Sequence, residues 1–164
     1  MSDFANLRAG GEALITAIAA LGTDVQLLPI MPNGVPVAIP IAQTLSLAIT
    51  PLEVERTDDG VQVMNVPDVV KSTVVVIDDG VETGTAAMAA AMALKPHVID
   101  RLVLAVPVCP REASAQLALV YDQMIAAKQP FARRALQWHY ADFNTIDDVI
   151  ARQMLAEHNQ AGSR

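Results

Sequence analysis

The chain has 164 residues, of which 52% are hydrophobic and only 4% aromatic, with 11 basic against 18 acidic side chains. The net charge of −7 opposes binding to nucleic acid or to an anionic membrane surface, because no basic patch is visible to offset it. A single cysteine, Cys109, excludes an internal disulfide and any metal site built from several cysteines, and we expect it to be a buried hydrophobe rather than a nucleophile.

The length and composition predict one α/β domain that covers residues 1–164. A chain of this size buries most of its apolar surface around a single core. Its many Val, Ile, Leu and Ala residues suit a mostly parallel sheet flanked by helices better than a β-sandwich. The start Met-Ser-Asp does not look like a secretory signal, and every apolar run is far shorter than the roughly 20 residues that span a bilayer. We therefore expect a cytoplasmic protein with no membrane partner.

The first part of the chain is predicted to contain a helix, a strand and a second helix. Apolar residues at helical spacing from Phe4 to Leu21 indicate the first helix, interrupted at Gly10-Gly11. The segment Val25 to Met31 is a short apolar strand. The second helix covers Val35 to Ser46, and Pro40 should kink it or shift its start, because proline lacks a backbone donor.

Two copies of the triplet Asp-Asp-Gly occur in different surroundings. Asp58-Asp59-Gly60 lies between Ile49 to Glu55 and Val61 to Val66, which alternate partly between apolar and polar residues and predict a β-hairpin. Asp78-Asp79-Gly80 instead follows Thr73 to Ile77, a continuously apolar run typical of a strand covered on both faces. A helix is predicted directly after this second turn.

The remaining elements alternate in the same way. Arg101 to Val108 is predicted as a buried strand, and Pro110 opens a helix that runs to about Ala127. Residues 129–144 are predicted to be irregular and to form a candidate hood segment. A last amphipathic helix covers Ile146 to about Glu157, and residues 159–164 are predicted to be a frayed tail.

The second triplet has the features of a ligand site. In a parallel sheet ligands bind beyond the carboxyl ends of the strands, where Asp78 and Asp79 are expected. Consecutive residues point to different sides, so the two acids suit separate hydroxyl or cation contacts better than one metal clamp. Residues 80–85 can curl their backbone N–H groups around an anion at a helix start, with Thr83 and Thr85 adding hydroxyl groups. A sugar phosphate fits this pattern, although an acid pair alone is also an ordinary solvated turn.

The run from Val74 to Ala87 resembles the phosphoribosyl pyrophosphate motif of type I phosphoribosyltransferases, in which a hydrophobic strand precedes two acids and a Thr-Gly loop. The resemblance implies a Rossmann-like fold in which Asp78 and Asp79 contact the ribose hydroxyls. It also implies that the loop binds the 5-phosphate. The loop residues are Gly80, Val81, Thr83, Gly84, Thr85 and Ala86. Shorter flanking segments look like those of bacterial predicted phosphoribosyltransferases of unsettled substrate.

The chain departs from this family in three places. Pro32, Asn33 and Gly34 occupy the position of the pyrophosphate loop, with proline where the bacterial group carries arginine. Ala86 stands where the family commonly has Thr or Ser. The hairpin and residues 65–71 leave little room for the family's flexible covering loop. Arg56, at the start of the hairpin, and Lys71 could nevertheless supply positive charge in this region.

The resemblance implies a protein that binds 5-phosphoribosyl 1-pyrophosphate with Mg²⁺ held mainly by substrate oxygens. It would transfer the phosphoribosyl group to a nitrogenous acceptor and release pyrophosphate. A non-catalytic sensor or regulatory subunit that kept the pocket is a second interpretation, and a structural oligomer with a vestigial pocket is a third. The resemblance and the alanine-rich helices also predict a homodimer whose other partners are small molecules.

Two features keep alternatives open, and a third has a single expected role. Glu82 is either a general acid or base in the loop or a solvated side chain near a helix start. Trp138 and Tyr140 either form a hood on which an acceptor base stacks or pack the irregular segment as a satellite cluster. Met88 and Met92 are expected to pack their helix against the sheet.

Overall fold

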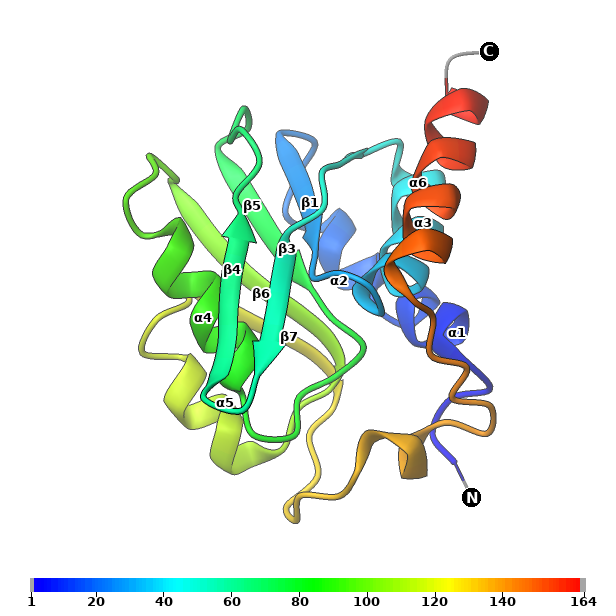
Figure 1. The fold of residues 1–164 in the computed structure, drawn as a ribbon, viewed down its shortest axis with the longest axis vertical. Coiled ribbons are helices and arrows are strands. Elements are labelled where there is room, and N and C mark those ends of the chain that lie inside the picture. The colour runs from blue at the N-terminus through cyan, green and yellow to red at the C-terminus, as the bar shows by residue number, and fades with distance from the viewer. Residues whose placement is uncertain (1, 163–164) are drawn as a thin grey trace.

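The computed structural model describes residues 2–162, which form a five-stranded parallel sheet flanked by helices, with a separate antiparallel strand pair (Figure 1). The strands are β1 (Val25–Pro29), β2 (Ala48–Ile49), β3 (Glu53–Thr57), β4 (Gly60–Asn65), β5 (Thr73–Ile77), β6 (Arg101–Val108) and β7 (Gln123–Lys128). The helices are α1 (Leu7–Glu12), α2 (Ile15–Ala19), α3 (Gly34–Leu45), α4 (Thr85–Leu94), α5 (Arg111–Leu117) and α6 (Asp148–Gly162), with a 3₁₀ turn η1 (Leu136–His139). The predicted α/β class is confirmed.

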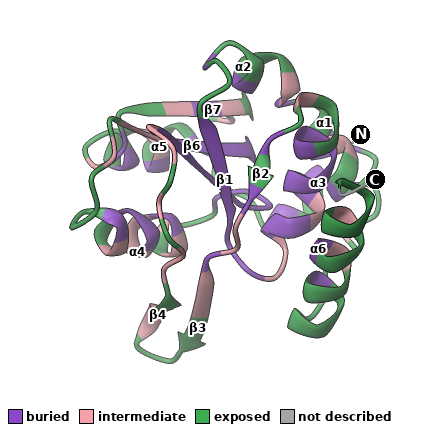
Figure 2. Ribbon diagram, turned by 90° about the horizontal axis from the view of Figure 1, so that it is seen from above, coloured by how far each residue is buried: buried purple, intermediate pink, exposed green. Residues whose placement is uncertain are grey.

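The sheet separates two apolar clusters, one on each face. Side chains alternate along a strand, so β5 sends Val75 and Ile77 into the cluster under α1, α2, α3 and α6. It sends Val74 and Val76 into the cluster under α4 and α5, which the hairpin also covers. Figure 2 shows the central strands buried between these helical layers. Double coverage explains why β5 is apolar at every position.

The strand order places a crevice between β1 and β5. The sheet runs β2-β1-β5-β6-β7, and every neighbouring pair is parallel. The chain leaves β1 through α3 toward β2, but leaves β5 through α4 toward β6, on the opposite face. Because the two connections diverge, the loops after β1 and β5 leave an opening between them, which is where open α/β sheets bind ligands.

The predicted first helix is wrong in one respect, because it is divided into α1 and α2 at Ala13 and Leu14 rather than at the glycines. Gly10 and Gly11 lie inside α1 and are buried. A Cβ at Gly11 would collide with the backbone carbonyl of Val37 in α3. The glycine pair therefore permits close helix packing instead of ending the helix.

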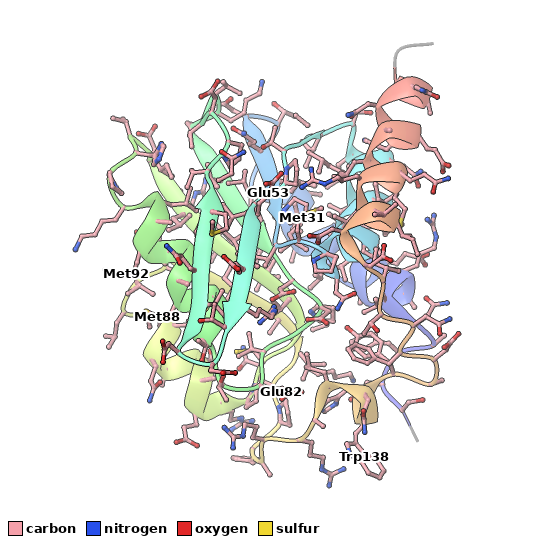
Figure 3. The ribbon with its side chains drawn as sticks, viewed as in Figure 1. Met31, Glu53, Glu82, Met88, Met92 and Trp138 are labelled. Carbon is pink, nitrogen blue, oxygen red and sulfur yellow. The ribbon has the colours of Figure 1, made fainter. Side chains whose placement is uncertain are left out.

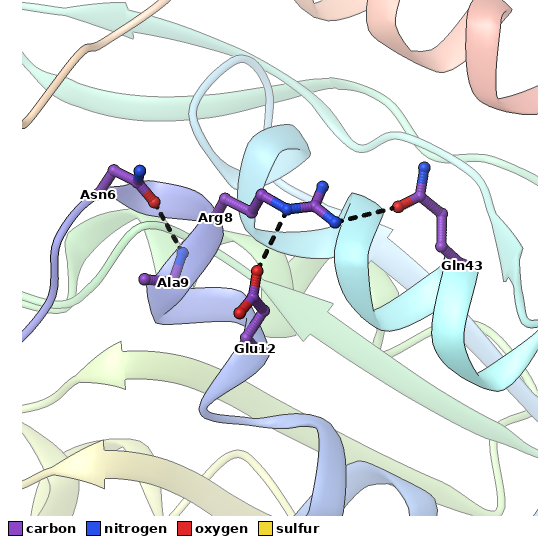
Figure 4. A network of polar contacts seen from close by, with 5 residues as sticks. All are labelled: Asn6, Arg8, Ala9, Glu12 and Gln43. Carbon is purple, nitrogen blue, oxygen red and sulfur yellow. Dashed lines mark hydrogen bonds and ion pairs between the residues drawn. The ribbon is translucent and has the colours of Figure 1, made fainter.

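Polar contacts hold the start of α1 on the surface of α3 (Figure 4). The Asn6 side-chain oxygen accepts a hydrogen bond from the Ala9 N–H at 2.9 Å and caps the helix. The Arg8 guanidinium lies 3.2 Å from the Glu12 carboxylate and also donates to Gln43 of α3 at 3.5 Å. The ion pair is exposed, so it contributes little to stability.

The predicted long helix after Pro110 is also wrong. Helix α5 ends at Leu117, and residues 123–128 form β7, which pairs with β6. Gln, Met, Ala and Lys favour a helix in isolation, but the exposed edge of β6 supplies backbone partners and an apolar face. Tertiary pairing therefore overrides local preference in this segment.

Smaller boundary differences affect three other elements. Helix α3 begins at Gly34 with Pro40 inside it, so the proline does not shift its start. Ile49 belongs to β2 in the main sheet, and the hairpin begins only at Glu53. Helix α6 continues to Gly162, so the predicted tail is wrong for residues 159–162, and residues 163–164 lie outside the described part. Of the helices in residues 2–162, none combines the length and the apolar character needed to cross a membrane.

Candidate functional site

A cavity of about 330 Å³ opens at the carboxyl ends of β1 and β5. It contains both predicted acids and the whole predicted 5-phosphate loop. Its other residues come from the loop after β1, the hairpin, and the segment before α6. The complete lining is Asn33, Arg56, Asp78, Asp79, Gly80, Val81, Glu82, Thr83, Gly84, Thr85, Ala86, Ala87, Leu136, Phe143 and Thr145. Residues far apart in the sequence thus meet at the position expected for a ligand.

The two acids are buried beside each other at the end of β5. Asp78 is 6% exposed and Asp79 8% exposed, and a carboxylate oxygen of Asp78 accepts a hydrogen bond from the Asp79 N–H at 2.8 Å. Burial raises the pKa of Asp78. Burial also raises the pKa of Asp79 well above its usual range, and the neighbouring charge of Asp78 raises it further. A hydroxyl donor or a cation would stabilise the ionised pair.

Arg56 supplies positive charge to this pair from the hairpin strand β3. Its charge lowers the pKa of both Asp78 and Asp79, although less strongly than burial raises them. Sequence analysis named Arg56 and Lys71 as residues that could supply positive charge in the region of the missing covering loop. Only Arg56 lines the cavity.

The loop between β5 and α4 presents unpaired backbone donors to the cavity. Within the described residues, no group accepts a hydrogen bond from the backbone N–H groups of residues 82–86. Gly84, with φ +86°, precedes α4, and the first N–H groups of a helix are free to bind an anion. The Thr83 and Thr85 hydroxyl oxygens lie 3.0 Å apart beside these donors. The loop therefore has the donors that an oxyanion requires.

Gly80 permits the tight turn between the acids and this loop. Its φ of +148° is one that L side chains rarely adopt. A Cβ at Gly80 would lie 2.5 Å from the Leu136 Cδ2 atom, so a side chain there would displace Leu136. The Val81 N–H donates to the Val108 carbonyl at 2.8 Å, which fixes the turn to the end of β6.

Glu82 has a partner that sequence reasoning missed. Its Oε1 atom accepts a hydrogen bond from the Leu136 N–H at 2.9 Å, which joins the loop to the 3₁₀ turn η1. Its side chain is thus neither simply solvated nor an unengaged acid or base. No sequence signal links the two residues, because they are 54 positions apart.

The predicted pyrophosphate loop is only partly at the cavity. The Met31–Pro32 peptide is cis, and of Pro32, Asn33 and Gly34 only Asn33 lines the cavity. The Gly34 N–H donates to the Ile30 carbonyl at 2.9 Å and is therefore already paired. The Asn33 Oδ1 atom accepts a hydrogen bond from the Ile146 N–H at 2.9 Å. In this conformation the loop is held by internal contacts rather than open to a ligand.

Of the two alternatives for Trp138 and Tyr140, the shared aromatic hood is wrong, because the structure separates the two rings, and Tyr140 instead packs in a cluster. Tyr140 is 4% exposed, packs between Phe4 and Phe143, and donates its hydroxyl to the Asp79 carbonyl at 2.6 Å. Trp138 is 68% exposed and lies outside the cavity, at the lower edge of the molecule in Figure 3. Tyr140 therefore fixes the backbone of Asp79 through a hydrogen bond, and neither aromatic ring lines the cavity.

Two other predictions concern residues outside the cavity. Cys109 is fully buried, and burial raises the pKa of its thiol to about 11, which supports a packing role. Met92 is 52% exposed, as Figure 3 also shows, so the prediction that it packs α4 against the sheet is wrong. Ala87, Ala90, Ala91 and Leu94 form the buried face instead. No group of three or more His, Cys, Asp or Glu side chains within residues 2–162 is arranged to hold a metal ion.

Comparison with solved structures shows that this chain has a known fold. The crystal structure of TT1426 from Thermus thermophilus superposes with a TM-score of 0.81 at 23% identity, covering 96% of this chain and 99% of that one. A purine phosphoribosyltransferase from Pyrococcus horikoshii gives a TM-score of 0.58 at 17% identity, covering 78% of this chain and 91% of that one. The chain has the phosphoribosyltransferase fold.

Sequence comparison agrees with the fold. A Mycobacterium tuberculosis protein with the provisional name phosphoribosyl transferase is 27% identical over 194 residues, covering 85% of this chain and 44% of the relative. This chain therefore spans less than half the length of the curated relatives it matches. No family model matches it. The resemblance to the phosphoribosyltransferases that the motif indicated is confirmed by these relatives and by the fold.

Proposed function

We propose that this protein binds 5-phosphoribosyl 1-pyrophosphate with Mg²⁺ and transfers the phosphoribosyl group to a nitrogenous acceptor, releasing pyrophosphate. The observation that carries the proposal is one cavity that contains both a buried acid pair and a loop of unpaired backbone N–H groups. A ligand that fits both needs hydroxyl groups and a phosphate on the same small molecule. The names of the sequence relatives and the fold support the same assignment.

Each part of the proposed substrate has a matching group. The loop at residues 82–86 would hold the 5-phosphate, and Asp78 and Asp79 would accept hydrogen bonds from the ribose hydroxyls. The two carboxylates are oxygen ligands of the kind that Mg²⁺ prefers, yet too few to form a metal site alone, which fits an ion that arrives with its substrate. When bound, Mg²⁺ would neutralise charge on the departing pyrophosphate.

The protein's contribution to the reaction would be positioning and electrostatics. Positive charge develops at the anomeric carbon as pyrophosphate leaves, and the carboxylates of Asp78 and Asp79 favour that charge. Arg56 would favour the ionised form of the pair, because its charge lowers the pKa of both acids, although burial raises them more strongly. Leu136 and Phe143 add apolar surface that excludes water from one side of the cavity.

The binding step is tested by calorimetric titration of 5-phosphoribosyl 1-pyrophosphate in the presence of Mg²⁺. We expect the wild type to bind, and the Asp78→Asn/Asp79→Asn variant to lose binding by at least about tenfold, because each ionised acceptor is worth about 1.5–3 kcal/mol. The matched control is Asp58→Asn/Asp59→Asn, which changes the same residues in the exposed hairpin turn. Equal binding by both double variants would reject the acid pair as the sugar site.

A non-catalytic sensor is the second candidate, and the loop after β1 favours it. Pro32 has no N–H, and the N–H groups of Gly34 and Val35 are paired with backbone carbonyls. A pyrophosphate group would find few donors there. An assay of pyrophosphate release across purines, pyrimidines and small amines separates the two. Release with any acceptor supports the transferase, and binding without release supports the sensor.

A further inference from the structure

One side of the cavity is formed by residues 136–146, which we call the wall. Three of its side chains line the cavity: Leu136, Phe143 and Thr145. Apart from the turn η1, the wall has no helix or strand of its own. Its position therefore depends on the contacts that tie it to neighbouring loops.

The wall is attached to two of the loops that line the cavity and to the N-terminal segment. The Ile146 N–H donates to Asn33 in the loop after β1 at 2.9 Å. The Tyr140 hydroxyl donates to the Asp79 carbonyl after β5 at 2.6 Å. Near Tyr140 the wall also pairs with the N-terminal segment, since the Ala141 N–H donates to the Phe4 carbonyl at 2.8 Å.

The end of the wall at Leu136 is held differently. There the tie is the hydrogen bond from the Leu136 N–H to the Glu82 carboxylate, together with the packing of the Leu136 side chain on Gly80. Glu82 is also part of the anion loop, because its own backbone N–H is among the unpaired donors. Glu82 thus belongs to the loop proposed to bind phosphate and also holds one end of the wall.

This bond has an electrostatic consequence for the loop. A carboxylate facing a bound phosphate would repel it. The Leu136 N–H engages the Glu82 carboxylate, while the Glu82 backbone N–H stays available to an anion. Figure 3 shows Glu82 nearer the centre of the molecule than Trp138, which lies on the same turn as Leu136.

We propose that Glu82 is a positioning residue that latches the wall to the phosphate loop, so that a phosphate ester in the loop and an ordered wall stabilise each other. The role requires only a hydrogen-bond acceptor and no proton transfer, which separates it from a general acid or base. The latch is independent of the transferase assignment. The coupling rests on the part of the proposed function that places a phosphate in this loop.

The latch is tested with Glu82→Ala and Glu82→Gln, because glutamine keeps the acceptor oxygen and removes only the charge. Loss of a hydrogen bond to a charged group should speed amide hydrogen exchange at Leu136 by about tenfold or more in Glu82→Ala. In Glu82→Gln the exchange rate at Leu136 should stay close to that of the wild type. The control Glu112→Ala removes an equivalent exposed carboxylate from the first turn of α5.

Trp138 gives a second readout, because it is the only tryptophan and lies two residues from Leu136. Its fluorescence anisotropy should fall in Glu82→Ala and remain unchanged in Glu82→Gln and Glu112→Ala. Wild-type exchange and anisotropy in Glu82→Ala would overturn the latch. Faster Leu136 exchange together with lower Trp138 anisotropy in Glu82→Gln would also overturn the proposed latch. The latch would then require the charge of Glu82 rather than a hydrogen-bond acceptor.

The coupling is tested with ribose 5-phosphate as the probe. Saturating probe should slow Leu136 exchange in the wild type and in Glu82→Gln, and leave it unchanged in Glu82→Ala. Binding without slower exchange in the wild type would overturn the coupling alone. Absence of binding to the wild type would overturn the coupling and the phosphate loop together, while the exchange of the ligand-free variants would still decide the latch.

Discussion

At the level of single residues, the buried acid pair is expected to lower the stability of the protein at neutral pH, where the proposed function needs both carboxylates. Asp78 and Asp79 are both buried, and burial raises the pKa of each. Ionising them without a ligand is therefore unfavourable, and only Arg56 among their charged neighbours offsets the cost. Functional sites often carry strained electrostatics of this kind.

Asp79→Asn should raise the melting temperature near neutral pH. A carboxyl whose pKa is raised by folding contributes its stability below the ordinary value of 3.8 and loses it as pH rises through the folded value. The Asp79→Asn variant carries no ionisable carboxyl at this position, so it avoids the loss of stability that the wild type undergoes when Asp79 ionises. We expect a gain on the scale of the 2–4 °C that about 1 kcal/mol gives in a domain of this size, measured by calorimetry at pH 7.5.

The gain from Asp79→Asn should shrink as the pH is lowered to below 3.8, where the Asp79 carboxyl is mostly protonated in both the folded and the unfolded chain. Asp59→Asn, in the exposed hairpin turn, is the control and should show no such trend. A melting temperature of Asp79→Asn equal to or below that of the wild type at pH 7.5 would contradict the assignment of a raised pKa.

Tyr140→Phe should destabilise the fold by about 1–3 kcal/mol, because it leaves the buried carbonyl of Asp79 without its donor. Burial raises the pKa of Tyr140, so the hydroxyl stays protonated and donates throughout the physiological range. Urea unfolding measures the change. Trp138→Phe, on the exposed neighbour, is the control, and equal midpoints for both variants would show that this bond contributes nothing.

At the level of elements, one buried side chain organises a connection that has no secondary structure. Gln26 in β1 is fully buried and donates to the Thr50 hydroxyl at 2.7 Å and to the Asp68 carbonyl at 2.8 Å. Its carbonyl oxygen accepts from the Val70 N–H at 3.0 Å. The stretch between β4 and β5 is therefore tied to the sheet, which agrees with the prediction that residues 65–71 leave little room for a covering loop.

Gln26→Leu should lower stability by about 2–4 kcal/mol, because it removes all three hydrogen bonds of a fully buried side chain. Thermal unfolding measures the loss, and hydrogen exchange at Val70 should rise with it. Thr50→Val removes one of the three bonds and should cost less. A variant Gln26→Leu as stable as Thr50→Val would show that the other two bonds are not needed.

At the level of the whole molecule, the apolar side chains left on the surface bear on the predicted homodimer. Met64 on β4 and Met92 on α4 are each about half exposed, at 55% and 52%, and these two elements pack against each other. Exposed methionines on neighbouring elements are a common feature of protein interfaces. The homodimer remains a prediction that this surface makes testable.

Sedimentation velocity should give a species of about twice the 17.4 kDa chain mass. If the surface around α4 contributes to the interface, Met92→Lys should shift the population toward monomer, because it places a charge in an apolar contact. Glu112→Lys, on exposed α5, serves as the control for added positive charge. A single 17.4 kDa species across a wide range of concentrations would reject the homodimer.

The sequence by itself determined the strand, turn and helix of residues 73–94, and with them the acid pair and the loop proposed to bind phosphate. These features follow from neighbouring residues: β-branched runs form strands, glycines permit tight turns, and the free N–H groups of a helix start bind anions. The α/β class and the hairpin follow from local patterns in the same way. That is why the central motif was recognisable in a chain without a matching family model.

Only the tertiary structure decided what surrounds that motif. Arg56 reaches the acids because the hairpin packs beside α4, and Leu136 closes the cavity because its N–H meets Glu82 from 54 positions away. Segment 123–128 became a strand for the same reason, since the partner strand β6 outweighs its helical preference. Such contacts depend on how distant segments pack, and the free energy of that packing is not encoded in any short stretch of sequence.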